Sequence, residues 1–513
     1  MRRIVPTRLG AEFIGAKAFR ASARAPIRAC LTPSNGLVRG RFGIATPAAL
    51  LALALGAATG ATACPAGAIA IAPGTSIQAA VRTADRGARF CLRPGVHRMQ
   101  SAIPKAGQVF VGEPGSVLSG ARPLAAFRRE GRFWVADGQR PPVVPRGACR
   151  PGYACREPVG VFVDDARLRQ AARPEDVEAK SFFLDRTSGR LYLAADPAGH
   201  RVEIAETQFA FVGSAPDVRY VGLTVEKYAS PAAEGAIHGK AASGWRIERS
   251  ELRLNTGAGI GLGPRGAAVD SNVHDNGHIG IAATGPDILI EGNTIRSNNA
   301  LGYDPDWEAG GVKATVSDRI VFRRNVVREN DGPGLWCDID CRDALFEDNV
   351  VESNADSGIF YEISYGARIV RNVVRNNGTR PQHWVWGAQI QIAGSERVEV
   401  AGNDVTVPPY GHGIMLIDQG RARDEGGLYK TRGNVVRDNT VRFAGPGRTG
   451  GTSDRPPGTE NAGIIEAGGN AFSRNVYLAA GTPPRFLWGY DEMSFAAFQG
   501  RGQEAGGRMA RGP

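Results

Sequence analysis

The chain has little of what builds a helical or membrane protein. Aromatic residues make up 7% of its 513 residues, only 7 residues are cysteine, and the repeated part shows no sustained helical period. The longest apolar run, residues 44–55, is too short and too rich in Ala and Gly to span a membrane. Glycine, by contrast, occurs 68 times and is spread along the chain. These features argue against a helical bundle and favour a turn-rich β protein.

The basic excess of the chain lies mainly at its N-terminal end. The net charge is +11, but residues 1–63 hold nine Lys or Arg and a single acid, Glu12. The rest of the chain is close to balanced and has no basic stripe with interleaved aromatic residues. Nucleic acid is therefore not an expected partner.

The N-terminal segment has the pattern of a secretory signal. Two arginines precede the apolar run, and residues 61–63 (Ala-Thr-Ala) form a small-x-small cleavage site. We therefore expect residues 1–63 to be a leader and signal peptide that is cleaved near Ala63. The mature protein is expected to be secreted or periplasmic, without a stable membrane span. Lipidation of Cys64 is the weaker alternative, because Ala61 stands where a larger aliphatic residue is usual.

Six cysteines follow the leader, an even number that predicts disulfides in a secreted chain. The economical pairing is Cys64–Cys91, Cys149–Cys155 and Cys337–Cys341. A metal site is the alternative, but no histidine cluster lies near these cysteines in the sequence, so no metal is expected.

A repeat of about 21–24 residues, lengthened by insertions, runs through the second half of the chain. Glycine followed by an apolar residue marks one column, and asparagine marks a second. The glycine column comprises Gly259, Gly280, Gly311, Gly334, Gly358, Gly413 and Gly463, with a weak match at Gly387. The asparagine column comprises Asn272, Asn293, Asn325, Asn349, Asn372 and Asn403.

The repeat units predict a solenoid. Each unit consists of short segments with an apolar period of two, as in residues 320–327, and is too small to bury its own apolar face. Stacked neighbours must bury that face instead. We therefore expect an all-β, right-handed parallel β-helix, in which aligned asparagines form hydrogen-bonded stacks at a turn. The asparagine column is interpreted as structural rather than catalytic.

Breaks in the repeat suggest the domain boundaries. Residues 64–120 are expected to hold an N-terminal cap, with a short capping helix near residues 75–81, and the first coils. Residues 121–206 break the repeat and predict an inserted β-rich domain. The main parallel β-helix is expected over residues 207–480. A C-terminal segment with a flexible tail is expected over residues 481–513.

Two acidic residues stand at the same place in adjacent repeats. Asp338 is the fourth residue after Gly334, and Glu362 is the fourth after Gly358. Because side chains alternate along a strand, both face outward on neighbouring coils, about 4.8 Å apart. That separation matches the roughly 5–5.5 Å of retaining glycosidases and falls short of the roughly 6.5–9.5 Å of inverting ones. The pair therefore favours a retaining glycoside hydrolase.

The columns beside the two acids supply further candidates. Trp336 and Phe360 flank the pair, and Lys313 precedes Trp336 by one coil, where it either binds substrate or is an ordinary solvated lysine. Alignment through Gly387 puts Gln391 in the column of the acids.

Insertions near residues 300–310 and 379–386 carry aromatic side chains. These side chains either wall a sugar cleft by stacking or simply pack the loops on the surface. Asp340 shares the strand parity of Asp338 but lies nearer the turn, and ranks second to it as an orienting residue. The candidate substrate-binding residues are Trp336, Phe360, Tyr361, Trp307, Trp384, Trp386 and Gln391, and the candidates for catalytic support are Asp340, Lys313 and Glu308.

Two motifs in this region resemble a known family. Residues 334–338 (Gly-Leu-Trp-Cys-Asp) and 360–366 (Phe-Tyr-Glu-Ile-Ser-Tyr-Gly) are similar to motifs on successive coils of the β-helix β-xylosidases of glycoside hydrolase family 120. The resemblance implies that Asp338 is the nucleophile and Glu362 the acid/base of a double displacement. It is specific over about residues 330–370 and extends to the rest of the chain only as architecture.

Two other functions remain open from the sequence. A polysaccharide lyase or uronan epimerase on the same fold typically uses a Lys, Arg or His base, often with Ca²⁺. Lys313, Glu308, Asp338 and Glu362 could be arranged for that chemistry, although the near-neutral body gives no sign of a polyanionic substrate. A non-catalytic glycan-binding or surface solenoid is the third possibility, because a fold never establishes a function. A carbohydrate partner is expected in each case, and the hydrolase needs no cofactor.

Overall fold

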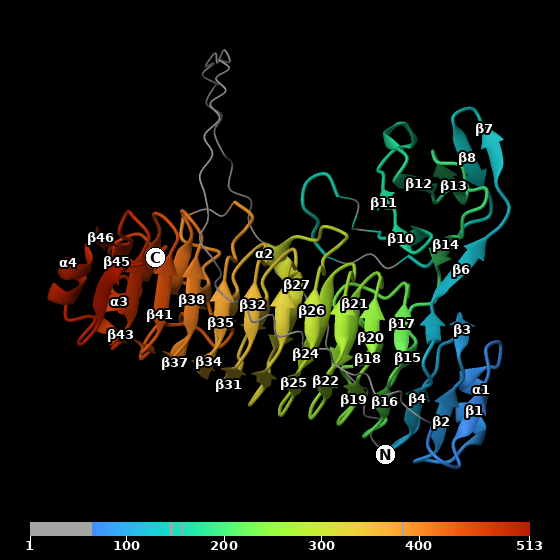
Figure 1. Cartoon of the computed structure of the whole chain (residues 1–513), viewed down its shortest axis with the longest axis horizontal. Helices are drawn as coiled ribbons and strands as arrows, with labels where there is room; N and C mark the ends of the chain where they lie inside the picture. The colour runs from blue at the N-terminus through green and yellow to red at the C-terminus, as the bar shows by residue number, and fades with distance from the viewer. Residues whose placement is uncertain (1–63, 144–146, 154, 156, 382–383, 513) are drawn as a thin grey trace, which may run out of the picture. The chain divides into compact units, whose positions relative to one another are not determined.

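The computed structural model describes residues 64–143, 147–153, 155, 157–381 and 384–512. The predicted leader and its cleavage site lie outside these residues. Within the described part, no helix has both the length and the apolar character that crossing a membrane requires. The described chain winds into a parallel β-helix, as the repeat predicted, and its coils follow one another in chain order (Figure 1).

Three long sheets of mainly parallel strands, named A, B and C here, build the β-helix. The described coils before residue 121 have strands in sheets A and B, and from residue 219 the chain visits A, B and C in turn. Sheet A contains β1 (Ile69–Ile71), β2 (Arg89–Leu92), β4 (Val109–Gly112), β16 (Arg219–Val221), β19 (Arg246–Glu248), β22 (Ala267–Val269), β25 (Leu289–Glu291), β28 (Val321–Arg323), β31 (Arg342–Glu347), β34 (Tyr365–Val370), β37 (Glu396–Ala401), β40 (Val435–Arg437) and β43 (Ala471–Ser473). Sheet B contains β3 (Gly95–Arg98), β5 (Ser116–Ser119), β17 (Thr224–Glu226), β20 (Glu251–Arg253), β23 (Asn272–His274), β26 (Thr294–Arg296), β29 (Val326–Arg328), β32 (Val350–Glu352), β35 (Val373–Arg375), β38 (Asp404–Val407), β41 (Thr440–Phe443), β44 (Val476–Ala479) and β47 (Arg508–Arg511). Sheet C contains β15 (Phe211–Val212), β18 (Gly235–Gly239), β21 (Ala258–Leu262), β24 (Ile279–Thr284), β27 (Gly310–Thr315), β30 (Leu335–Asp338), β33 (Ile359–Glu362), β36 (Ile390–Ala393), β39 (His412–Asp418), β42 (Arg448–Ser453), β45 (Arg485–Gly489) and β46 (Asp491–Met493).

The interior of the β-helix is filled by columns of aliphatic side chains. In sheet C one such column runs through Ile260, Ile281, Val312, Leu335, Ile359, Ile390 and Ile414, each paired with the next. All of these side chains are at most 2% exposed. Burying each contributes roughly 1.5–3 kcal/mol, and the register of the column fixes which side chains on the same strands point outward.

The asparagine column forms a ladder of hydrogen bonds, with one correction. Each member accepts a hydrogen bond from the backbone N–H of the residue at the same position one coil earlier. Where that earlier residue is asparagine, its side-chain amide donates to the same oxygen, as Asn293 does to Asn325. The ladder passes through Ser250 and Ser271 rather than the predicted Asn272, because Asn272 is the first residue of β23. It continues through Asn349, Asn372, Asn403, Asn439 and Asn475 to Glu504.

A second asparagine ladder, which the sequence had not indicated, lies beside the glycine column. A Cβ at Gly334 would come within 2.7 Å of the Gly358 carbonyl and within 2.9 Å of the Asn354 amide. The glycine column is therefore required by close approach of the next coil and of this ladder. The ladder runs through Asn255, Asn276, Asn298, Asn330, Asn354 and Asn377 to Gln389.

Both ends of the β-helix are covered. Helix α1 (Ile77–Thr83) is capped by the Ser76 hydroxyl and buries Ile77 and Val81, close to the predicted position. At the other end, β45 and β46 extend sheet C, α4 (Phe495–Gly500) packs on the core, and β47 extends sheet B. The prediction of a flexible tail within residues 481–513 is therefore wrong. Three aromatic side chains hold this segment in the core: Phe486, Trp488 and Phe498.

Strands β6 to β14 interrupt the coils and form two small sheets. One contains β6 (Ala121–Leu124), β9 (Val161–Val163), β10 (Ala166–Arg167) and β14 (Val202–Ala205). The other contains β7 (Arg128–Glu130), β8 (Phe133–Ala136), β11 (Arg169–Gln170), β12 (Ser181–Asp185) and β13 (Arg190–Leu193), and a 3₁₀ turn spans Pro174–Asp176. These strands share a separate apolar core.

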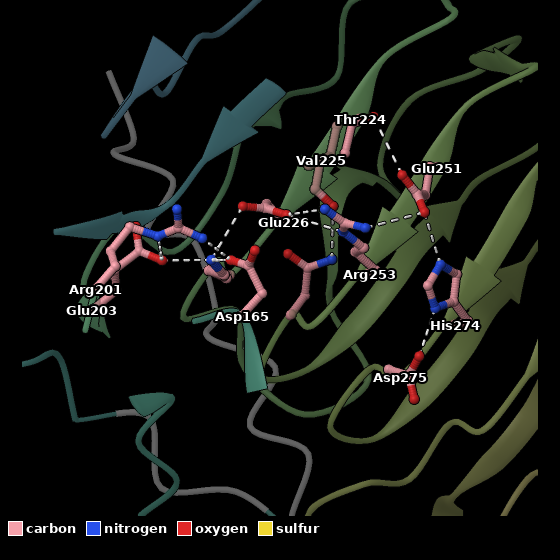
Figure 2. A network of polar contacts seen from close by, with 12 residues as sticks. Asp165, Arg201, Glu203, Thr224, Val225, Glu226, Glu251, Arg253, His274 and Asp275 are labelled. Atoms are coloured by element: carbon pink, nitrogen blue, oxygen red, sulfur yellow. Dashed lines mark hydrogen bonds and ion pairs between the residues drawn. The ribbon is translucent and has the colours of Figure 1, made fainter. Parts of the chain in front are cut away.

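A buried lysine joins the inserted strands to the β-helix. Lys227 follows β17 and is 1% exposed. Its ammonium contacts the carboxylates of Asp165 and Glu203 from the inserted segment and lies 3.4 Å from Glu226 of β17. Figure 2 shows these three acids in a network that continues through Arg253 to Glu251. One cation therefore balances acids from both parts of the chain.

The three disulfides are those predicted from the cysteine spacing. Cys64–Cys91, Cys149–Cys155 and Cys337–Cys341 are bonded, with Cα separations of 5.7, 5.7 and 6.2 Å. The Cys64 sulfur is thus used in a disulfide.

Candidate active site

The two predicted acids end adjacent strands of sheet C. Asp338 is the last residue of β30, Glu362 is the last residue of β33, and the strands pair in a register that places these two side chains opposite each other. Thr315 lies opposite Asp338 on the preceding coil. Ala393 lies opposite Glu362 on the following coil. The acids are therefore neighbours in one outward column, flanked by small side chains.

The predicted position of Gln391 is wrong by one column. Gln391 lies opposite Phe360, not in the column of the acids. The alignment through Gly387 fails because Gln389 stands where other coils have glycine. The Gln389 side chain closes the second ladder by accepting from the Asn377 amide and returning a hydrogen bond to its backbone carbonyl.

A backbone turn directly after the acids fixes where each strand ends. Val316, Ile339 and Ile363 each follow the column of the acids, and their φ angles are 49°, 54° and 38°. Left-handed backbone is unusual for β-branched residues and stores local strain. The turn brings the chain away from sheet C immediately after Asp338 and Glu362, so both carboxyl groups stand at the strand ends.

A cavity of about 280 Å³ lies over the ends of these strands. This volume is near the lower end of the range for small-molecule sites, roughly 300–1,000 Å³. Glu362 lines the cavity, and Asp338 lies behind the lining, next to Trp336 and Glu362. The lining residues are Pro305, Asp306, Pro333, Trp336, Asp356, Phe360, Glu362, Trp386, Gln391, Gln419 and Asp454.

Glu362 is held in an environment that favours its protonated form. Its side chain is nearly buried, and Oε1 accepts hydrogen bonds from Gln419 at 3.0 Å and Arg421 at 3.3 Å. Burial, and then the nearby Asp338 carboxylate, raises the pKa of Glu362 to about 7, even though Gln419, Arg421 and Lys313 act in the opposite direction. A carboxyl group with this pKa can both give and take a proton near neutral pH.

Asp338 is paired with a cation on one side only. Its Oδ2 lies 3.0 Å from Nζ of Lys313, and that ammonium lies 3.7 Å from the ring centroid of Trp336. Asp338 Oδ1 and Trp336 Nε1 are buried without a hydrogen-bond partner among the described residues. Because buried polar atoms nearly always have partners, these two atoms are the ones expected to meet a ligand.

Two aromatic rings form one side of the site. Trp336 and Phe360 stack with centroids 5.4 Å apart and an angle of 12° between their planes. Trp386 meets Phe360 edge-on at 6.3 Å. All three, which are candidate substrate-binding residues from the sequence, line the cavity.

The other predicted residues lie outside the cavity lining. Tyr361 is a correction: it faces the core, is 0% exposed, and donates to the carbonyl of Gly366 at 2.7 Å. Trp307, in the short helix before β27, and Trp384, in the loop before β36, are 36% and 42% exposed. Glu308 ends the short helix α2 (Pro305–Glu308).

Asp340, the acid ranked second to Asp338, contacts Tyr429. It lies in the loop closed by the Cys337–Cys341 disulfide, and it accepts a hydrogen bond from the Tyr429 hydroxyl at 3.2 Å. The carboxylate that raises the pKa of Glu362 belongs to Asp338. The structure thus brings together Glu362 and Asp338 and leaves Asp340 at the turn.

Four polar residues of the site were not found from the sequence. Gln419 and Arg421 lie after β39, two coils beyond Glu362, in a long loop without a repeat signal. Asp356 precedes β33, and Asp454 follows β42; both line the cavity. None of the four belongs to a column that recurs at a fixed position in successive coils, so the repeat could not indicate them.

One group of three possible metal ligands occurs among the described residues, formed by Cys64, Cys91 and Glu113. Its two sulfurs form a disulfide and are therefore not thiolate ligands.

Comparison with known proteins supports the fold. Residues 235–405 match the family model of the right-handed β-helix region. The structure of XylC in complex with xylose is similar with a TM-score of 0.61 and 14% identity, covering 81% of this chain and 82% of XylC. The A-module of the mannuronan C-5 epimerase AlgE6 from Azotobacter vinelandii gives a TM-score of 0.42 and 12% identity, covering 84% of this chain and 93% of that module. No curated protein sequence matches. The chain is a right-handed parallel β-helix protein.

Proposed function

We propose that this protein is a retaining glycoside hydrolase in which Asp338 is the nucleophile and Glu362 the acid/base. The observation that carries the proposal is the pairing of these two carboxyl groups on adjacent coils beside an aromatic-walled cavity. Strands in a sheet lie about 4.8 Å apart, which suits the roughly 5–5.5 Å carboxyl separation of retaining enzymes. XylC, which shares the fold, binds xylose, which supports a sugar as substrate.

The environments of the two acids suit different roles in a double displacement. Lys313 pairs with Oδ2 of Asp338, and Oδ1, without a partner among the described residues, is the oxygen that would attack the anomeric carbon. Glu362 in its protonated form would give its proton to the leaving oxygen. Glu362 would then take a proton from water, which releases the sugar from Asp338.

The raised pKa of Glu362 predicts how activity depends on pH. The first step needs protonated Glu362, so kcat/KM on a glycoside is expected to fall as pH rises through about 7. Glu362→Gln is expected to lose this limb of the profile together with most of the activity, and added azide is expected to restore turnover of an activated aryl glycoside.

The nucleophile is identified most directly by trapping it. A 2-fluoro aryl glycoside of a cleaved sugar should label the enzyme once, and peptide mass spectrometry should place the label on Asp338. A label on Asp340 or Asp356 would contradict the assignment, and formation of product with inverted configuration, observed by NMR, would contradict retention.

The secreted location remains part of the proposal, and three disulfides support it because such bonds persist in oxidising compartments. A lyase is tested by incubating the protein with a panel of neutral and uronate-containing glycans, with and without a chelator. Unsaturated uronate that disappears on chelation would replace the hydrolase with a Ca²⁺-dependent lyase.

A further inference from the structure

The cavity contains a second polar group of residues, separate from the two acids and Lys313. Asp356 and Ser357 lie in the turn before β33, and Gln391 lies in β36 one coil later. Asp356 and Gln391 both line the cavity that Glu362 also lines. Their exposures are 9% for Asp356, 0% for Ser357 and 1% for Gln391. Nearly buried polar groups in a cavity wall are expected to have defined partners.

The serine hydroxyl connects the aspartate to the glutamine. Ser357 Oγ lies 3.1 Å from Oε1 of Gln391 and 3.3 Å from Oδ1 of Asp356. A hydroxyl has one hydrogen to donate, and the shorter contact assigns it to Gln391. The Gln391 oxygen also accepts from the backbone N–H of Ala388 at 3.5 Å. The amide is thus fixed with its oxygen toward the protein, which leaves the two N–H donors to serve the cavity.

Asp356 retains free acceptor capacity. Its Oδ1 accepts from the backbone N–H of Ser357 at 2.6 Å, and its Oδ2 accepts from Arg380 at 3.3 Å. A carboxylate can accept about four hydrogen bonds, so one position on each oxygen remains. Burial raises the pKa of Asp356 against the effect of Arg380, in agreement with a position largely shielded from water.

The cavity lining has one sign of charge. Its charged members are Asp306, Asp356, Glu362 and Asp454, and the described lining contains no Lys, Arg or His. Arg380 and Arg421 lie outside the lining and pair with Asp356 and Glu362, so an anionic ligand would meet acids on the wall and cations that are already paired, which disfavours it. An uncharged ring with several hydroxyl groups matches acceptors on Asp356, donors on Gln391 and the indole N–H of Trp336.

We propose that Asp356 and Gln391 are the residues that recognise the hydroxyl groups of an uncharged sugar ring in this cavity, and that Ser357 positions them. Asp356 accepts from two adjacent hydroxyl groups of the ring, and Gln391 donates to a sugar oxygen. Ser357 contacts both residues but not the cavity. That the ligand is the sugar whose bond is cleaved rests on the proposed function.

Kinetics of one isosteric variant test the recognition. Asp356→Asn keeps the shape and removes the charged acceptor, and is expected to lower kcat/KM on a neutral aryl glycoside about 10–100-fold, the range for a charge-assisted hydrogen bond. A substrate that lacks the contacted hydroxyl should be cleaved poorly by the unaltered enzyme and no more poorly by the variant. Asp348→Asn is the matched control, because Asp348 also pairs with an arginine, Arg371, but lies outside the cavity. If removing the hydroxyl lowers kcat/KM by the same factor in the variant as in the unaltered enzyme, Asp356 does not contact that hydroxyl and its proposed role is overturned.

Ser357→Ala separates positioning from contact. This variant removes the hydroxyl that holds the Gln391 amide, while the backbone N–H of residue 357 still holds Asp356, so KM is expected to rise about tenfold with kcat nearly unchanged. An unchanged KM would overturn the positioning role.

Sugar binding distinguishes failure of recognition from failure of the hydrolase. Calorimetry with neutral monosaccharides and with uronates is done on Glu362→Gln, with and without Asp356→Asn. Binding of a neutral sugar that Asp356→Asn abolishes, without cleavage by the unaltered enzyme, would keep the recognition and reject the hydrolase. Cleavage that Asp356→Asn leaves unchanged would reject the recognition and keep the hydrolase. Preferential binding of uronates, or of no sugar at all, would overturn the recognition.

Discussion

Glu362, the proposed acid/base, has a shifted pKa that lowers the stability of the fold. Its ordinary pKa is 4.5 and its pKa in the folded protein is about 7, so the folded state binds more protons than the unfolded state between these values. The free energy of unfolding therefore falls as pH rises from about 4.5 to about 7 and is level above that. The shift corresponds to on the order of 3 kcal/mol.

Glu362→Gln removes this penalty and is expected to be more stable than the unaltered protein at pH 8 but similar to it at pH 5. Thermal unfolding across this pH range measures the difference. Glu352→Gln, which removes an exposed glutamate paired with Arg375, is the control and should show no such gain. A gain of the same size at pH 5 and pH 8 would contradict the explanation.

Lys313 is expected to support both stability and activity through one contact. Lys313→Met leaves the Asp338 carboxylate buried without its cation, which destabilises by roughly 3–5 kcal/mol. Adding Asp338→Asn should restore much of the stability and none of the activity, because the nucleophile is then absent. Chemical denaturation and an aryl glycoside assay check the two effects, with exposed Lys180→Met as the control. Failure of the double variant to recover stability would show that Lys313 acts mainly by packing on Trp336.

At the scale of secondary-structure elements, the ladder makes some asparagines costly to replace and others not. Asn293 accepts from the Ser271 backbone N–H and donates to Asn325 and to the Ala268 carbonyl. Asn293→Ala leaves several buried groups unpaired, each costing about 1–3 kcal/mol, and is expected to destabilise by at least about 3 kcal/mol. Asn272, one residue from the ladder, has a buried side-chain oxygen without a partner in the described structure. Asn272→Ala is therefore expected to be neutral or stabilising, and thermal unfolding of the pair separates the two positions.

The same elements show how far the sequence could indicate the structure. Because the coils stack, each repeats the same strand register. The sheets, the first ladder and the adjacency of Asp338 and Glu362 were therefore predictable from the spacing of the glycine and asparagine columns. One coil was misaligned because Gln389, whose side chain caps the second ladder, stands where the other coils have the glycine that marks the repeat. Gln419 and Arg421 come from a loop whose length no repeat constrains. Contacts made by such loops depend on tertiary structure alone.

At the scale of the whole molecule, the inserted strands are attached through acids that one buried lysine compensates together with Arg98, Arg201 and Arg253. Lys227 is nearly fully buried among Asp165, Glu203 and Glu226, and Arg98 lies 2.6 Å from Glu203. Removing the lysine charge leaves three neighbouring carboxylates with less cationic compensation, a situation that typically costs 3–5 kcal/mol. The loss should be felt where the inserted strands meet the coils rather than in the sheets that carry the site.

Lys227→Met is therefore expected to expose residues 121–205 to limited proteolysis while the β-helix core stays resistant. The sign of the pH dependence follows from the acids: without Lys227 their ionisation is unfavourable in the folded state, so protonation at about pH 4 should restore much of the stability. Lys105→Met, which removes a lysine that contacts only backbone carbonyls, is the control and should show no such recovery. If cleavage of Lys227→Met is equally fast at pH 4 and pH 8, the attachment depends on the packing of the lysine stem and not on its charge.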